Sequence, residues 1–209
     1  MEEITSLESI IKERETWENL IEGSTKLLEN INGIKADSKN ELLKRYISVL
    51  WALKSVKEAK DEIERSVYNI ANHVNISILQ ETIRKYISCL DSALDYLQKF
   101  VSDINKTQIL PKLPFDRKDK DFSDRVNKIR NEILHECVPT LEIIKSSGEN
   151  IRCPAYTNGI ETDVVDVRIK YDHDGVCKWF SLCDFIKITY EPTQKEIQII
   201  TLEIVSAFK

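Results

Sequence analysis

Residues 124–135 bring together an arginine, an amide and a histidine at short spacing: Arg130, Asn131 and His135. A histidine titrates near neutral pH and can take up or release a proton at a reacting atom. An arginine keeps its charge and grips phosphate oxygens with a fork of N–H donors. Cleavage of RNA by attack of a 2′-hydroxyl group needs proton transfer and positive charge at one place, so these residue types suit phosphodiester chemistry.

The same stretch is predicted to form one amphipathic helix. With about 100° per residue, its apolar side chains fall on one arc, formed by Val126, Ile129, Ile133, Leu134, Cys137, Leu141 and Ile144. Arg130 falls in the middle of that arc, and an unpaired charge is very costly to bury. We therefore expect Arg130 to pair, or the arc to face a wet cleft or a partner chain. Asn131 and His135 are four residues apart and stack on a face that flanks the arc.

The string Arg130-Asn131-x-x-x-His135 resembles the signature of the HEPN superfamily, an arginine followed by a polar residue and then by a histidine. The resemblance is specific over these six residues and architectural elsewhere. It implies an all-α fold and a metal-independent endoribonuclease without a cofactor, used as a toxin or in antiviral defence. It also implies that Arg130 and His135 are the catalytic pair, with Asn131 as their positioning neighbour, and that the product is a 2′,3′-cyclic phosphate. The implied partners are RNA, a second copy in a homodimer whose two motifs share one cleft, and an antitoxin, often nucleotidyltransferase-like, or a defence complex.

Basic side chains adjoin the motif, because residues 112–130 hold seven Lys or Arg against four Asp. The candidate RNA-binding residues are Lys112, Arg117, Lys118, Lys120, Arg125 and Lys128. One interpretation is a loop that follows the phosphate backbone, and the other is a solvated loop of mixed charge. The sequence favours neither. Asp172-His173-Asp174 has no spaced partner ligand, so we expect a turn there and no metal site.

Composition narrows the class of protein. The 209 residues are 42% hydrophobic and 31% charged, as in an ordinary folded protein. The net charge of −5 gives no overall attraction to nucleic acid, so any RNA site must be a local basic patch. The first residues lack a signal-peptide core, no apolar run approaches a membrane span, and the five cysteines form no C-x-x-C pair. We therefore expect a cytoplasmic protein with reduced thiols and no membrane partner.

Helical periodicity extends to Gly148. A first helix is predicted from residue 2 to about residue 22, with a short helical piece over 24–34. The inward positions of the first helix are Ile4, Leu7, Ile11, Trp17 and Ile21. The capping box over 38–41 predicts the start of a long helix that ends near Asn72. We also expect Trp51 to be a core residue.

The next helix has the most regular apolar stripe in the chain. Asn75 or Ser77 is predicted to cap it, and it ends near Asn105. Its stripe alternates spacings of four and three, as in an a/d seam, and requires a packed partner helix. The stripe consists of Ile83, Ile87, Leu90, Leu94, Leu97, Val101 and Ile104. After a loop over 106–121, the motif helix is predicted from about Phe122 to Ser147, with a kink at Pro139.

After Gly148 the pattern changes to that of strands. Residues 164–171 are β-branched and partly alternating, and residues 176–180 follow a turn at 173–175, which predicts a β-hairpin. An isolated hairpin is marginal in water, so it must pack on the bundle or on a partner. For the tail we favour a short helix over 182–190 and a helix over 192–208 that starts at Pro192. Strands are the alternative, because 186–190 and 197–199 also alternate.

These elements predict a mainly α fold. An HEPN-like helix bundle over 1–148 carries the motif helix, and a β-hairpin plus C-terminal helix over 149–209 packs on it. The first functional hypothesis is the metal-independent endoribonuclease acting as a toxin or defence effector. The alternative is a non-catalytic HEPN-like module for dimerisation or interaction in a defence or regulatory complex, and a third is a structural adaptor that binds through its hairpin and tail. An intrachain salt bridge of Arg130 far from His135 supports the module, whereas a cleft shared across a two-fold axis supports the nuclease.

Overall fold

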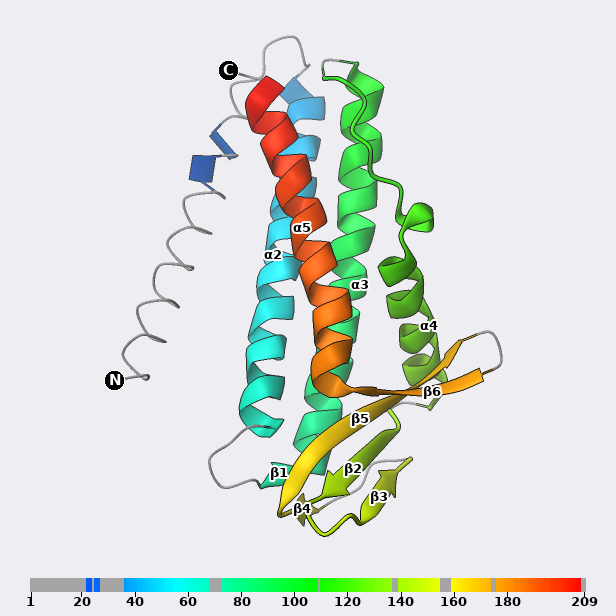
Figure 1. The fold of residues 1–209 in the computed structure, drawn as a ribbon. Helices are drawn as coiled ribbons and strands as arrows, with labels where there is room; N and C mark the ends of the chain where they lie inside the picture. The colour runs from blue at the N-terminus through cyan, green and yellow to red at the C-terminus, as the bar shows by residue number, and fades with distance from the viewer. Residues whose placement is uncertain are drawn as a thin grey trace.

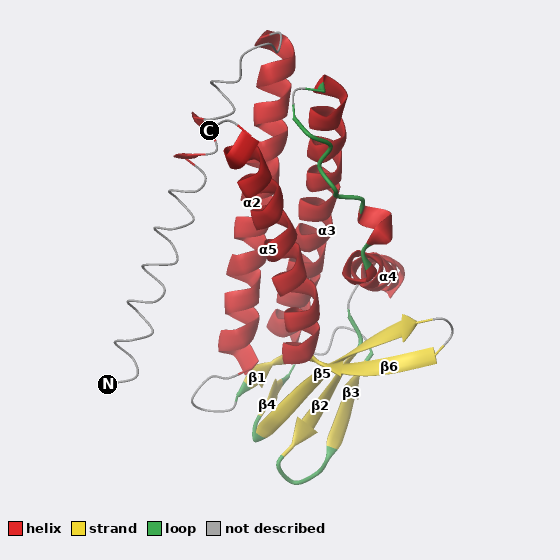
Figure 2. Ribbon diagram, turned by 45° about the horizontal axis from the view of Figure 1, so that its top comes forward, coloured by secondary structure: helices red, strands yellow, loops and turns green. Residues whose placement is uncertain are grey.

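The computed structural model describes residues 22–23, 25–26, 36–67, 73–108, 110–136, 139–154, 159–173 and 176–207. Three long helices lie side by side, a shorter helix flanks them, and a small antiparallel sheet closes one end of the bundle (Figure 1). Figure 2 shows the same separation of helices from strands. The predicted mainly α fold, with a β-hairpin and a C-terminal helix, is confirmed.

The centre of the bundle is the pair α2 (Ala36–Val67) and α3 (Ile76–Thr107). All seven residues of the predicted α3 stripe are buried, which confirms that stripe. Asn75 is the N-cap of α3, since its side-chain oxygen accepts a hydrogen bond from Ile78 N at 3.2 Å. The start predicted for α2 is wrong, because Ala36 is already helical and Ser38 therefore lies inside the helix rather than at its cap.

The motif helix α4 (Asp121–Glu136) follows a short 3₁₀ helix, η1 (Arg117–Asp119). The prediction that this helix continues to Ser147 is wrong, because residues 141–145 form strand β2. The expected kink at Pro139 is also wrong, since the helix has ended before the proline. Proline lacks the backbone donor and disfavours helical backbone in the residue before it, so α4 stops and an Ile-rich strand begins.

The sheet has the strand order β3-β2-β5-β6, with all neighbours antiparallel. Its strands are β2 (Leu141–Lys145), β3 (Asn150–Cys153), β5 (Val164–His173) and β6 (Val176–Ser181). The predicted hairpin is thus confirmed as β5 and β6. Gly148, with φ of +83°, supplies the left-handed turn between β2 and β3. A separate two-stranded pairing joins β1 (Val74–Asn75) to β4 (Ile160–Glu161).

Helix α5 (Leu182–Ala207) completes the bundle. The prediction of helix for the tail is confirmed and the strand alternative is wrong, although a single helix with Pro192 inside it replaces the two predicted ones. Buried hydroxyl pairs join α5 to both central helices: Tyr46 to Thr201 at 2.9 Å and Tyr86 to Thr189 at 2.8 Å. Buried side chains on both sides of residue 148 enter one hydrophobic cluster, and β2, which precedes that residue, is a central strand of the sheet.

The first predicted helix, over 2–22, lies outside the described residues apart from Glu22, and so does most of the piece over 24–34. Glu22, Gly23, Thr25 and Lys26 are helical. The prediction of a buried Trp51 is wrong, because 62% of this side chain is exposed. Within the described part of the chain, every helix is too short or too polar to cross a membrane.

Candidate functional site

Arg130 of α4 is tied to a buried carboxylate on α3. Its Nε lies 2.9 Å from Oδ2 of Asp91, whose side chain is only 7% exposed, while the Arg130 side chain is 41% exposed. The expectation that Arg130 pairs is therefore confirmed. The partner lies on a neighbouring helix of the same chain. Val126, Ile129 and Ile133 of the apolar arc are buried, and α4 contacts α3, α5 and β5.

A second guanidinium meets the same carboxylate. Arg117 of η1 donates from Nη2 to Oδ1 of Asp91 and from Nη1 to Oδ1 of Asp95. Its Nε donates to Ser123 Oγ at 2.8 Å. Asp91 thus receives one arginine on each carboxylate oxygen, and α3, η1 and α4 are joined at this point.

The two arginines differ in how many of their guanidinium nitrogens are already hydrogen-bonded within the cluster. Arg117 has all three kinds of guanidinium nitrogen engaged and is 17% exposed. Arg130 uses Nε alone, and no described residue accepts a hydrogen bond from its two Nη atoms. A charge-assisted bond to a buried carboxylate fixes the plane of a guanidinium. Arg130 can therefore present its Nη atoms to an anionic ligand, whereas Arg117 acts inside the cluster.

The structure places the three motif residues on one uninterrupted helix. Arg130 and His135 are five residues apart, which corresponds to roughly 7.5 Å along the helix axis and about 140° around it. Asn131 is exposed. The backbone of His135 belongs to the last turn of α4, and its side chain lies outside what the structure describes. The two motif residues are thus close along α4, with the ion pair of Arg130 one turn before the histidine.

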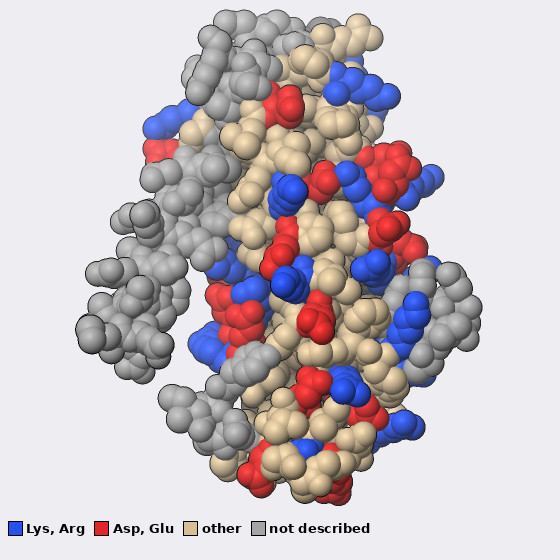
Figure 3. Space-filling model, in the orientation of Figure 1, with Lys and Arg blue, Asp and Glu red and all other residues tan. Residues whose placement is uncertain are grey.

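The remaining basic candidates do not form a continuous track of unpaired charge. Lys120 pairs with Glu196 of α5 at 2.6 Å, and Lys128 pairs with Asp124 at 2.9 Å. Lys112, Lys118 and Arg125 make no ion pair with any described residue. On the face drawn in Figure 3, basic and acidic side chains alternate over the surface. An anion that approaches α4 along this face therefore meets isolated cations.

Sequence reasoning missed Asp91, the residue that organises the cluster. The signal was present in the α3 stripe, because Asp91 follows Leu90 and precedes Leu94 by three residues, at the edge of the buried face. A carboxylate at such a position requires a cationic partner. Which cation it receives depends on how η1 and α4 pack, and the local pattern of α3 does not contain that information.

Comparisons of the chain with models of protein families, with curated proteins and with solved structures find no match. The residues of this site and their geometry therefore carry the functional argument.

Proposed function

We propose that this protein is a metal-independent endoribonuclease of the HEPN type that acts as a toxin or antiviral effector. The observation that supports the proposal best is the state of Arg130. A buried carboxylate holds this guanidinium at Nε, and its two Nη atoms have no acceptor among the described residues. A donor fixed before the substrate arrives stabilises charge that develops on a phosphate at little cost in reorganisation.

In the proposed reaction the 2′-oxygen of a ribose attacks the adjacent phosphorus atom. His135 of one protomer accepts the 2′-hydroxyl proton as the new P–O bond forms. The bond from phosphorus to the 5′-oxygen breaks, and the His135 of the second protomer protonates that leaving oxygen. The products are a 2′,3′-cyclic phosphate and a 5′-hydroxyl end. Arg130 neutralises the phosphate oxygens, and Asn131 keeps the substrate in position.

The test is cleavage of a labelled mixed RNA pool by the purified full chain in EDTA. Wild type should release ends that carry a cyclic phosphate, and both Arg130→Ala and His135→Ala should lose this activity. Arg84→Ala is the matched control, because Arg84 is 48% exposed on α3 and bonds only weakly to Glu81 at 3.9 Å. Undiminished cleavage by both motif variants, or cleavage that EDTA abolishes, would remove the proposal.

The second candidate function is the non-catalytic helical interaction module. The observation that favours it is the same intrachain ion pair, because an arginine committed to Asp91 can serve the packing of α4 on α3 alone. Wild-type protein that cleaves none of the pool, together with an Arg130→Ala variant that loses stability, would support the module. Normal stability of that variant with lost cleavage would support the nuclease.

A further inference from the structure

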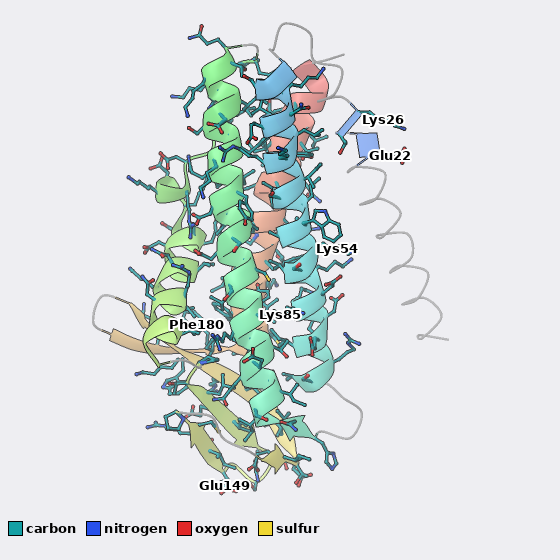
Figure 4. The ribbon with its side chains drawn as sticks, turned by 180° about the vertical axis from the view of Figure 1, so that it is seen from behind. Glu22, Lys26, Lys54, Lys85, Glu149 and Phe180 are labelled. Atoms are coloured by element: carbon teal, nitrogen blue, oxygen red, sulfur yellow. The ribbon has the colours of Figure 1, made fainter. Side chains whose placement is uncertain are left out.

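A groove with an unusually exposed tryptophan lies between α2 and α3. Its volume is about 470 Å³. Trp51 is 62% exposed and Tyr96 is 39% exposed. The lining consists of these two aromatic residues with Ser48, Ala52, Ser55, Ser88, Cys89 and Ser92. Figure 4 views α2 and α3 with α5 behind them, so the two helices have a side that the bundle does not cover.

Small side chains between two aromatic ones suit the approach of another helix. The serines, the alanine and the cysteine leave room for a backbone, and Trp51 and Tyr96 offer apolar area on either side of it. Exposed apolar surface with a polar rim marks an interaction site. The groove therefore fits an amphipathic segment.

We infer that residues 1–21 of this same chain bind in the groove as an amphipathic helix. The apolar stripe of that segment has the helical spacing that such a groove accepts, and it consists of Ile4, Leu7, Ile11, Trp17 and Ile21. The chain is already helical at Glu22 and Lys26, which form an i,i+4 ion pair at 2.6 Å. Both are labelled in Figure 4, beside the end of the bundle at which α2 begins.

The segment is long enough to reach the groove. Twenty-one residues of helix span about 32 Å, and Trp51 lies about 22 Å along α2 from its start at Ala36. A tether as short as residues 22–35 gives the segment an effective concentration on the order of millimolar at the groove. The segment of the same chain therefore outcompetes a second copy at micromolar protein.

Charge favours the same occupant. The segment carries six glutamates against Lys12 and Arg14. The groove is flanked by Lys54, whose Nζ lies 5.1 Å from the Trp51 ring centre, and by Lys99, whose Nζ lies 6.0 Å from that of Tyr96. Lys85 also lies close enough to the Cys89 thiol to favour its thiolate form, whereas Glu58 opposes that form.

Cys89 provides the readout, because it is a free, half-buried thiol in the lining. The experiment measures its alkylation by iodoacetamide in the full chain, followed on the Cys89 peptide by mass spectrometry. Burial raises the pKa of Cys89, so labelling at about pH 9 keeps the thiolate fraction measurable. Leu7→Asp/Ile11→Asp should raise the alkylation rate at least about tenfold. The control Ser9→Asp/Thr16→Asp adds the same charge on the opposite helix face and should leave the rate unchanged.

Two outcomes would overturn the inference. Equal alkylation of wild type and Leu7→Asp/Ile11→Asp would show that the stripe does not cover the groove. Protection that rises with protein concentration would assign the groove to a second copy. A second measurement does not depend on destabilising the segment: Leu7→Cys or Ile11→Cys should form an intrachain disulfide with Cys89 under mild oxidation at micromolar protein. Failure of both would contradict the inference.

Discussion

Asp91 on α3 accepts Arg130 on one carboxylate oxygen and Arg117 on the other, and its side chain is 7% exposed. Two chain segments that lie 26 and 39 residues away along the sequence thus converge on one buried charge. This arrangement couples the stability of the α3–α4 contact to the orientation of the arginine proposed to bind phosphate.

Replacement of Asp91 by Asn should lower the free energy of unfolding by about 2 kcal/mol. Breaking a fully buried pair costs roughly 3–5 kcal/mol, and the loss here is smaller because Arg130 is partly exposed. Urea unfolding followed by tryptophan fluorescence measures the change. Asp95→Asn is the control, since its side chain is 51% exposed and its loss should stay below about 1 kcal/mol. Equal losses in the two variants would contradict the central role of Asp91.

The Arg130→Lys variant should show whether cleavage needs the guanidinium geometry of Arg130 or only its positive charge. A lysine ammonium can pair with Asp91 or with a phosphate, whereas the guanidinium can bond Asp91 through Nε and a phosphate through Nη. We expect RNA cleavage to fall by about 100-fold, while the free energy of unfolding changes by less than about 1 kcal/mol. Arg84→Lys serves as the matched substitution. Wild-type cleavage by Arg130→Lys would show that the fork geometry is unimportant.

Gln80 joins α3 to the chain that follows the motif helix. It is fully buried, and its Nε2 donates to the carbonyl oxygen of Pro139 at 3.2 Å and to that of Cys153 at 3.4 Å. Gln80→Leu keeps the size of the side chain and deprives both carbonyls of this donor, so the free energy of unfolding should fall by about 2 kcal/mol. Gln198→Leu changes an exposed residue of α5 and should have little effect in the same urea titration. A loss in Gln80→Leu no larger than in this control would refute the bridging role.

The Tyr86 hydroxyl predicts a dependence of stability on alkaline pH. Burial raises the pKa of Tyr86 above its ordinary value, and the hydrogen bond to Thr189 opposes this only in part. A pKa raised in the folded state gives stability that is complete below the unfolded pKa of about 10 and is lost as the pH rises above it. Urea unfolding between about pH 9 and pH 11.5 should therefore show a steeper decline for wild type than for Tyr86→Phe.

Tyr86→Phe should also lose about 1 kcal/mol at neutral pH, since one buried hydrogen bond disappears. Tyr96→Phe is the control, because Tyr96 is exposed and should alter neither the neutral stability nor its alkaline slope. Parallel slopes for wild type and Tyr86→Phe would show that Tyr86 ionises without opening the core.

The local sequence pattern predicts the correct structure where nearby residues alone determine an element. The α3 stripe, the Asn75 cap and the hairpin β5–β6 follow from spacing and side-chain type within a few residues. The motif helix was extended past Pro139 because Leu141 and Ile144 continue its periodicity. That periodicity of apolar residues is equally compatible with a buried strand, and pairing with β3 and β5 decides in favour of the strand.

The contacts that form the candidate site join distant parts of the chain, so no local sequence pattern predicts them. The sequence indicated that Arg130 needs a partner, and that expectation is confirmed, but Asp91 lies on another helix. The prediction that Trp51 is a core residue is wrong, because the α2 face that carries it is not covered by α3 or α5. Its exposure is informative for that reason, since it marks the groove to which we assign residues 1–21.

Closure of the bundle by α5 sets the order of events during synthesis. The hydroxyl pairs Tyr86–Thr189 and Tyr46–Thr201 join residues 103 and 155 positions apart. A chain that leaves the ribosome from its N-terminus cannot form them until α5 has emerged from the exit tunnel. The faces of α2 and α3 that α5 covers therefore stay uncovered for as long as this helix is still inside the ribosome.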